Sequence, residues 1–401
     1  MLRFIAADLR RHALGVAAVV LLIALATALG VVVTLQERAL RLGSARAADS
    51  FDLVVGAPGS EAQLVLSAVF LQPAPLPLVR GSVLAGLLAD PRVAWAAPVG
   101  FGDFVADSPV VGTMPSLVEG LGGLTEGRGF AYLNEAVVGA SVPLRMGARV
   151  HPMHGHAFGV GLVHGTVTYE VVGRMAPTGT AWDRAVLVPI EAVWRVHAAE
   201  GGARAAPPDL AAPVRPEAVA DPQAPGLPAI LVKPRSIADA YKLRQDYRTE
   251  RTLAVFPAEV LTRLYGTLGD ARQVLAAVAL GAQGLVAAAI LLVVTAHIAQ
   301  RRRQIGALRA FGAPRASIFA IVWLEAFFII GAGLLAGFGF GYIAARAVSA
   351  WLTSQSGVAM PVGFAAQDLV VVAGFLAAGA LLAAVPASLA FRQSPAGALR
   401  G

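Results

Sequence analysis

Four histidines gathered in one stretch are the residues whose types and spacing best suit chemistry. Of seven histidines, four stand at His151, His154, His156 and His164. The H-x-H spacing puts His154 and His156 on the same face of a strand. Zinc takes three or four nitrogen, oxygen or sulfur ligands, so the stretch predicts a zinc site. The alternative interpretation is a polar loop followed by a strand.

Other motifs give little support to catalysis. The turn Gly56–Ser60 (GAPGS) resembles a phosphate-binding loop, but it lacks the G-K-[ST] ending and has no lysine nearby. Asp183 and Arg184, beside Trp182, are expected to form a turn with a local ion pair. The sequence has no cysteine, which excludes disulfides, thiolate ligands and cysteine nucleophiles. We expect no catalytic residue and no nucleotide or other cofactor bound by this chain, apart from the zinc considered above.

One basic stretch, Ala299–Phe319, has a pattern that suits a protein partner. It reads AQRRRQIGALRAFGAPRASIF and contains five arginines and no acidic residue. Ile305, Leu308 and Phe311 recur at helical spacing and predict one apolar face, with Gly312 and Pro314 as the stop signal. An apolar helix face framed by arginines is typical of a segment that docks into a groove on another protein.

The elements that position these residues are predicted to be membrane helices. The 401 residues are 57% hydrophobic and only 14% charged, which indicates a membrane protein. Four runs are long enough to cross a bilayer, which takes about 20 residues. They are Ala13–Leu35, Ala271–Ala299, Ala316–Ala345 and Leu369–Phe391. The first run could instead be a cleaved signal peptide, but it exceeds the usual apolar region of about 7–15 residues, which favours a retained helix.

The positive charge of the chain indicates its orientation. Ten arginines and one aspartate lie in the three segments expected inside the cell, which more than accounts for the net charge of +7. These segments are the amphipathic Met1–His12, the loop Gln300–Arg315 and the tail Arg392–Gly401. Because positive loops stay in the cytoplasm, both termini are predicted to be cytoplasmic. The basicity therefore does not indicate a nucleic-acid partner.

The segment Gln36–Asp270, between the first two runs, has the mixed charges and turn residues of an exterior α+β domain. Its expected elements are strands at 51–55, 136–139, 166–172, 185–188, 229–233 and 252–256, helices at 61–70 and 236–248, and a hairpin over 93–113. Strand-helix-strand patterns at both ends predict a split domain, residues 36–115 with 228–270. An inserted lobe spans 116–197, and a mobile loop spans 198–227, where large apolar residues are few. A short external loop is expected at 346–368.

The third apolar run carries a small-residue face and one acid. Gly333, Gly337 and Gly341 have the small-xxx-small spacing that allows close helix packing, either within the chain or between two copies. Glu325 is a carboxylate inside this run and must face protein or water. Its alternatives are a proton or substrate site and an interhelical hydrogen bond, of which we favour the hydrogen bond.

This arrangement resembles the permease subunit of FtsX/MacB/LolC-type ABC transporters. The segment Arg302–Phe311 with Gly312, Ala313 and Ile318 is similar to the family's R-x-x-[EQ]-I-G-x-L-[RK]-A-[LI]-G-A loop, and RQSPAGALR at the end is similar to its closing motif. The sequence departs from the family at three positions. Gln304 stands where many members have Glu, Phe311 where Leu or Ile is usual, and Leu389 where the closing motif has Arg. Three further stretches resemble a bacterial subgroup, namely residues 52–70, 178–197 and 255–270.

The resemblance implies a multi-pass α-helical membrane protein of the bacterial inner membrane, with four transmembrane helices and a large extracytoplasmic α+β domain between the first two. It implies a cytoplasmic ATPase that holds ATP and Mg²⁺, and a second permease copy or homologue. The implied contacts to the ATPase are Arg302, Arg303, Gln304, Ile305, Gly306, Leu308, Arg309, Phe311 and Gly312. The expected function is to transmit ATP-driven motion that extracts, releases or exports a lipoprotein, a lipid or a small hydrophobic molecule.

Two alternatives stay open. The chain could be an FtsX-like regulator of a cell-envelope hydrolase, working with a periplasmic protein. It could also be a permease that handles a metal or metal complex, which rests on the histidines alone. The two-lobed size of the exterior segment favours transport over the regulator.

Overall fold

The computed structural model describes residues 2–153, 167–200, 209–264 and 314–392, with a few separate positions between 264 and 314. The chain forms two compact units. The membrane unit consists of residues 1–40, 268–350 and 361–401, and the exterior unit consists of residues 41–267 and 351–360. Each unit is described by itself below. The second expected span and the loop after it fall largely outside the described residues.

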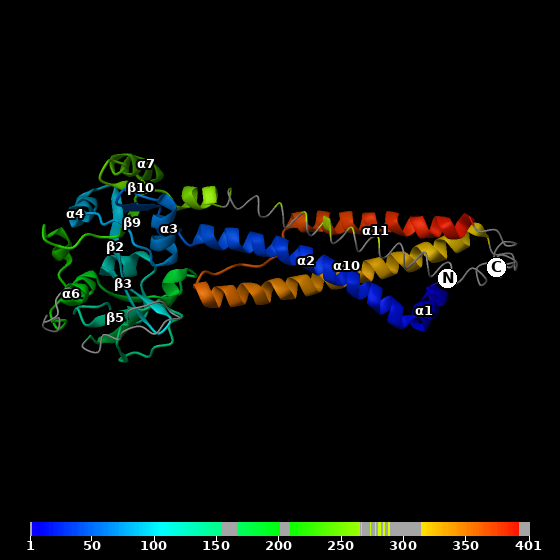
Figure 1. Cartoon of the computed structure of the whole chain (residues 1–401), viewed down its shortest axis with the longest axis horizontal. Coiled ribbons are helices and arrows are strands. Elements are labelled where there is room, and N and C mark those ends of the chain that lie inside the picture. Colours follow the sequence, from blue (N-terminus) through cyan, green and yellow to red (C-terminus); the bar gives the residue numbers. More distant parts are fainter. Residues whose placement is uncertain are drawn as a thin grey trace. The chain divides into compact units, whose positions relative to one another are not determined.

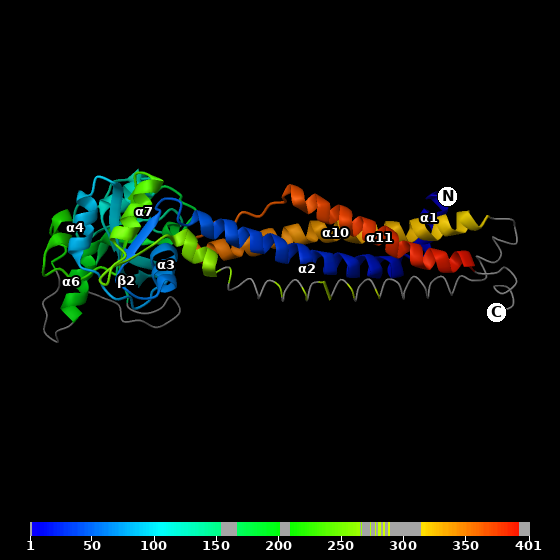
Figure 2. The same ribbon diagram turned by 90° about the horizontal axis from the view of Figure 1, so that it is seen from above.

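The membrane unit is built on long helices that lie side by side (Figures 1 and 2). They are α2 (Ala13–Arg46), α10 (Arg315–Ser356) and α11 (Ala366–Arg392), preceded by the short α1 (Leu2–Arg11). Within the described residues, three helices are long and apolar enough to cross a membrane, namely α2, α10 from Ala316 and α11 as far as Val385. The count of four spans stays a prediction, because Ala271–Ala299 lies mostly outside the described part.

Two helices are longer than the sequence analysis expected. The first helix continues from Leu35 to Arg46, and α10 continues from Ala345 to Ser356, so the expected external loop at 346–368 is wrong over its first eleven residues. The physical reason is that both extensions are rich in Ala, Leu, Ser and Arg and contain no proline. The helix α10 stops at Gly357, whose φ of +74° is a left-handed conformation that favours glycine.

The exterior unit has strands, α-helices and two short 3-10 helices. In chain order they are β1 (Leu53–Gly56), α3 (Glu61–Phe70), α4 (Gly81–Ala89), β2 (Val93–Val105), β3 (Ser108–Thr113), α5 (Pro115–Gly120), β4 (Leu124–Gly127), β5 (Glu135–Val138), β6 (Arg149–Val150), β7 (Tyr169–Met175), η1 (Ala181–Arg184), β8 (Val186–Pro189), α6 (Ile190–Glu200), η2 (Pro216–Ala220), β9 (Ala229–Pro234), α7 (Ile237–Asp246) and β10 (Leu253–Val255). Residues 257–264 are helical.

One continuous run of paired strands organises this unit. Its order is β10-β1-β9-β2-β3-β8-β5-β7-β4, with β6 paired to β7. The strand β1 pairs antiparallel with both β9 and β10, so the two ends of the exterior segment meet in the sheet, as a split domain requires. The long strand β2 pairs with β9 through its first half and with β3 through its second half. It therefore runs through both parts of the domain.

Alternating apolar residues give the sheet two buried faces. Along β1, Leu53 and Val55 pack with α4 and α7, whereas Val54 packs with α3 and α5 on the opposite face. The same alternation separates Val186 and Val188 from Leu187 in β8. The core on the Val54 face includes residues of both the split part and the inserted part. The two parts are therefore joined by a shared core.

The expected mobile loop at 198–227 stays a prediction, but its described part, residues 209–227, makes contacts with the rest of the exterior unit. Leu210 and Val219 are buried, Leu227 bridges Val79, and Pro213 bridges Tyr132. The loop has few large apolar residues, but Leu210 enters the core around Val186, whereas Val219 and Leu227 enter the core around Leu53. Residues 201–208 lie outside the described part.

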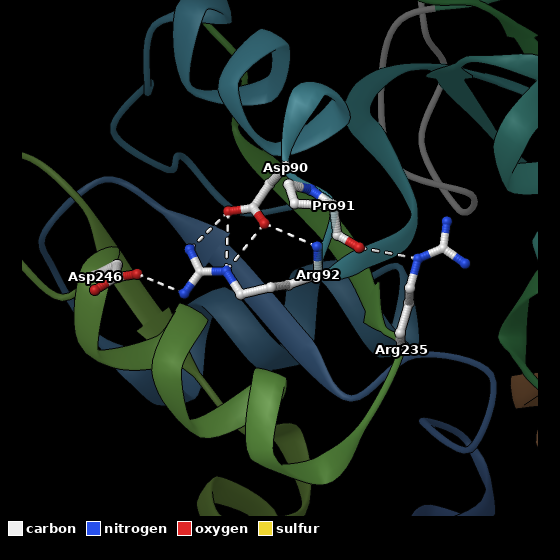
Figure 3. Close-up of polar contacts among 5 residues, drawn as sticks. All are labelled: Asp90, Pro91, Arg92, Arg235 and Asp246. Carbon is white, nitrogen blue, oxygen red and sulfur yellow. Dashed lines mark hydrogen bonds and ion pairs between the residues drawn. The ribbon is translucent and has the colours of Figure 1, made fainter.

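A polar network braces the split part of the domain. The Arg92 guanidinium donates to both oxygens of Asp90, with Nη2 at 2.6 Å from Oδ2, and its Nη1 lies 2.9 Å from Asp246 Oδ2 (Figure 3). Arg235 Nε donates to the carbonyl of Pro91 at 3.0 Å. The hydrogen bond from Arg92 lowers the pKa of Asp90. These contacts tie the turn before β2 to α7, which is a structural role.

Candidate functional site

The segment expected to dock on an ATPase, Arg302 through Gly312, lies outside the described residues. The described chain resumes at Pro314 and enters α10 at Arg315. The site that can be built from described residues is therefore in the rest of the membrane unit, where α2, α10 and α11 pack together.

The three glycines of the third span form the contact between α10 and α2. A Cβ added at Gly333 would lie 2.6 Å from Ile23 Cβ, one at Gly337 would lie 2.5 Å from Thr27 Cβ, and one at Gly341 would lie 2.7 Å from Val31 Cβ. Real Cβ contacts are longer, so only glycine allows this approach. Of the two packing alternatives, the structure shows the contact within the chain.

An ion pair joins α2 to the start of α11. Arg38 Nη1 and Nη2 donate to Asp368 Oδ2 and Oδ1, both at 2.8 Å, and Nη1 also reaches the Gly363 carbonyl at 3.3 Å. Asp368 in turn accepts from the backbone N–H of Ala365 at 2.7 Å. Each side chain of the pair is only 13% exposed. A bidentate arginine–carboxylate pair fixes both distance and orientation between the two helices.

Beside this pair lies a cavity of about 250 Å³. Its walls are mainly apolar, with Val31, Leu35, Phe338, Phe364, Val371 and Phe375 among the lining residues. Polar lining comes from Thr27, Thr34, Glu37 and Asp368. A largely apolar pocket with a few polar groups is typical of a site for an apolar or amphiphilic ligand.

Neither the ion pair nor the cavity was predicted from the sequence. A signal was present, because Arg38 follows the first apolar run and Asp368 precedes the last. Both ends lie on the same side of the membrane in the predicted topology. The aromatic residues Phe338, Phe364 and Phe375 carried no such signal, because their spacing along the sequence does not reveal a shared pocket.

Glu325 is half-buried on α10, and it has an interaction partner. This is compatible with the interhelical hydrogen bond favoured from the sequence. The role of Glu325 in helix packing stays a prediction.

The predicted zinc ligands are not assembled within the described residues. His151 lies after β6, and its Nδ1 is 2.8 Å from the Val167 carbonyl and 3.3 Å from Thr168 Oγ1. His154, His156 and His164 lie outside the described residues. Among the residues that the structure describes, no group of three or more potential metal ligands occurs. The zinc site therefore stays a prediction.

Two buried carboxylates of the exterior unit are held by arginines. Glu135 accepts from Arg128 and from the N–H groups of Ala131 and Tyr132, and the hydrogen bond from Arg128 lowers its pKa. Burial raises the pKa of Glu191, but hydrogen bonds from Arg215 and Arg195 outweigh that effect and lower it overall. Both carboxylates are engaged in internal contacts and are structural.

Asp183 was expected to form an ion pair with Arg184, but its carboxylate instead accepts hydrogen bonds from within the turn. Its Oδ1 accepts from the Thr178 N–H and Oγ1, both at 2.7 Å, and its Oδ2 accepts from the Gly179 N–H at 2.8 Å. The reason is burial, since a carboxylate that is 6% exposed needs several donors, and the turn's own N–H groups supply them.

Comparisons with known proteins give a family match for the C-terminal part of the chain. Residues 276–396 match the family model described as FtsX-like permease C-terminal. A search of curated proteins finds no match. Among solved structures, the periplasmic region of MacB from Actinobacillus actinomycetemcomitans is 9% identical, covers 54% of this chain and 95% of its own, and has a TM-score of 0.33.

A second solved structure is the extracellular domain of the noncanonic ABC-type transporter YknZ from Gram-positive bacteria. It is 11% identical, covers 51% of this chain and 98% of its own, and has a TM-score of 0.29. The family match includes the basic stretch Arg302–Phe311, on which the predicted resemblance depends most. That resemblance is confirmed, in that residues 276–396 match the FtsX-like permease C-terminal model.

Proposed function

We propose that this permease converts ATP binding by a separate cytoplasmic ATPase into movement of its exterior domain. The observation that carries the proposal is the FtsX-like family match over residues 276–396, which contains the predicted docking stretch. Supporting it, α2 and α10 are single helices of 34 and 42 residues, longer than the about 20 residues that a bilayer requires. Each helix extends beyond the membrane unit, since Arg41–Arg46 and Trp351–Ser356 belong to the exterior unit.

The proposed mechanism uses these helices as levers. The ATPase grips the arginine-framed face of Ile305, Leu308 and Phe311. Helix α10 begins immediately after this stretch and continues without interruption as far as Ser356. A displacement of its cytoplasmic end is therefore carried along its length, because helices are stiff over this distance. We place the protein in the bacterial inner membrane with both termini in the cytoplasm, in accord with its basic segments.

The cavity beside the Arg38–Asp368 pair supports a proposal for the substrate class. Its aromatic and aliphatic walls support an apolar or amphiphilic substrate, such as a lipid, a lipoprotein acyl chain or a small hydrophobic molecule. The alternative of a metal substrate has His151 as its single described residue, and the cavity supplies none of the nitrogen ligands that a transition metal prefers.

The docking step is tested by Leu308→Asp, which puts a charge on the apolar face of the stretch. We expect the full-length variant to fold and insert but to lose co-purification with its partner ATPase. Ala310→Asp is the matched control, because it adds the same charge on the opposite side of the predicted helix. If the Leu308→Asp complex is purified intact, the proposed docking face is wrong. If both variants lose the complex, the stretch acts through its charge and not through an apolar face.

A further inference from the structure

The turn Thr178–Asp183 is held in one shape by internal hydrogen bonds, and it accepts a further hydrogen bond from another segment of the chain. It follows β7, includes the first three residues of η1 and is held by the buried Asp183 carboxylate. Thr178 Oγ1 also lies 2.7 Å from Thr180 Oγ1, and the Ser141 N–H donates to the Asp183 carbonyl at 2.8 Å. Every one of these contacts stiffens the turn in one shape. That shape leaves the Gly179 carbonyl to accept from outside the turn.

The group that donates to Gly179 comes from the far end of the sequence. The Ala359 N–H, just beyond α10, donates to the Gly179 carbonyl at 2.8 Å. The preceding Gly357 is buried against the same turn, since a Cβ added there would lie 3.0 Å from the Thr180 carbonyl and 3.1 Å from Arg184 Cγ. Both residues belong to the exterior unit, so the contact is internal to one compact body.

Between them, Val358 is inserted into the main core of the exterior unit. Its exposed fraction is 3%, and it belongs to the cluster that includes Trp182, Ala181 and Phe51. Val358 stands in the connection between two membrane helices. Burial of its apolar side chain in the core of the exterior unit stabilises the connection in that position. The last part of α2 also contacts the Gly357–Ala359 segment, because a Cβ at Gly43 would lie 2.7 Å from the Ala359 carbonyl.

We infer that the Thr178–Asp183 turn is a receptor for Gly357–Ala359, and that this docking gives the exterior domain a fixed attachment to the end of α10. Asp183 is the positioning residue, because it sets the turn whose carbonyl and surface receive the segment. At the end of α10, the Gly357 N–H donates to the Thr353 carbonyl at 2.8 Å. The docked segment therefore follows the helix directly, with no linker residues between them. The exterior domain is thereby moved by α10 directly.

The docking does not depend on the proposed function, but its part in transmission rests on it. The experiment therefore has two arms. The first arm uses the full-length chain alone in nanodiscs. The sequence has no cysteine, so Gly179→Cys and Ala359→Cys introduce the sole thiols. A Cβ at Gly179 would lie 3.3 Å from Ala359 Cβ, and the φ of +68° at Gly179 puts the same strain into every variant of this background. This distance is close to the about 3.5–4.5 Å of a disulfide, so mild oxidation should cross-link the pair.

Two glycine variants in this background separate docking from general strain. Gly357 and Gly147 have the same φ of +74°, but a Cβ at Gly147 would meet nothing within 4 Å. We expect Gly357→Ala to lower the cross-linked fraction several-fold and Gly147→Ala to leave it unchanged. A matched valine pair, Val358→Ala and Val142→Ala, removes the same methyl groups from residues that are both 3% exposed. Of these two variants, Val358→Ala should lower the cross-linked fraction and Val142→Ala should leave it unchanged.

The role of Asp183 is tested in the same background. Asp183→Ala should lower the cross-linked fraction several-fold. Glu135→Ala, which removes another buried carboxylate that accepts from backbone N–H groups, should leave it unchanged. A pair that does not cross-link, or equal effects of the Gly357 and Gly147 variants, would overturn the docking.

The second arm uses the complex with the partner ATPase. We expect the oxidised, cross-linked permease to support the same ATPase rate as the reduced one, because the attachment is permanent. Loss of ATPase activity on cross-linking would show that the segment undocks during the cycle, which contradicts a fixed attachment. A chain that cross-links but forms no complex with an ATPase overturns the proposed function and leaves the docking supported.

Discussion

At the residue scale, Gly337 decides how closely α10 approaches α2. The methyl group of Gly337→Ala would meet Thr27 Cβ at 2.5 Å and the Ala24 carbonyl at 2.7 Å. We expect this change to destabilise the full-length protein by about 1–3 kcal/mol, as overpacking usually does. The measurement is thermal unfolding in detergent. Gly339→Ala is the control, because it lies on the same helix with nothing within 4 Å. Equal unfolding temperatures for the two variants would contradict the packing role.

Glu191 makes the stability of the exterior unit depend on pH. Its folded pKa is lower than its unfolded pKa of about 4.3, so its contribution is fully present above that value. The contribution is lost as the pH falls from there through the lower, folded pKa. We expect the unfolding temperature of Glu191→Gln to fall less between pH 7 and pH 3.5 than that of the parent chain.

The control for this pH effect is Glu119→Gln, which changes an exposed acid. It should keep the parent's dependence on pH. Glu135 and Glu61 also have lowered pKa values, so Glu191→Gln flattens the dependence only in part. A Glu191→Gln chain with the parent's full pH dependence would show that the carboxylate is not stabilised by Arg215 and Arg195 in solution.

At the element scale, the Arg38–Asp368 pair links two membrane helices. We expect a double-mutant cycle of Arg38→Ala and Asp368→Ala to give a coupling energy of about 0.5–3 kcal/mol, because each side chain is 13% exposed. The control cycle uses Arg149 and Glu170, which are 3.9 Å apart and 77% and 46% exposed. It should give about 0–1 kcal/mol. Thermal unfolding of the full chain measures both, and equal couplings would contradict a special role for Arg38.

Most elements of the exterior unit could be predicted from local patterns. The helix at Glu61–Phe70 has Ser60 as its N-cap, and its observed bounds equal the predicted ones. Ser236 likewise caps α7, and the hairpin expected over 93–113 corresponds to β2 and β3. These signals are local, since a cap or an alternating strand is specified by residues that are neighbours in the sequence.

Features that join distant segments could not be predicted in the same way. Val358 entering a core with Trp182, and Asp183 shaping a turn for Ala359, depend on residues about 180 positions apart. A single sequence contains no signal for such pairs. The contacts of the expected mobile loop could not be predicted for a related reason, because Leu210 and Val219 are buried in cores that are assembled from other parts of the chain.

At the scale of the whole molecule, the proposed function depends on how the chain connects the two units. It passes from one unit to the other at residues 40–41, 267–268, 350–351 and 360–361, and the first and third of these passages lie inside α2 and α10. The docked Gly357–Ala359 segment adds an attachment close to the end of α10. These features support the proposal that the exterior domain follows the movement of the membrane helices.

The measurement that tests this claim most directly is a distance between the two units in the complex with the ATPase. Ile237→Cys and Leu369→Cys place spin labels at residues that are 80% and 73% exposed, in a chain without native cysteine. Pulsed electron paramagnetic resonance then compares nucleotide-free complex with complex trapped by ATP, Mg²⁺ and vanadate. We predict a shifted distance distribution on trapping, and no shift in the Leu308→Asp chain. Identical distributions in the free and trapped complexes would contradict ATP-driven movement of the exterior domain.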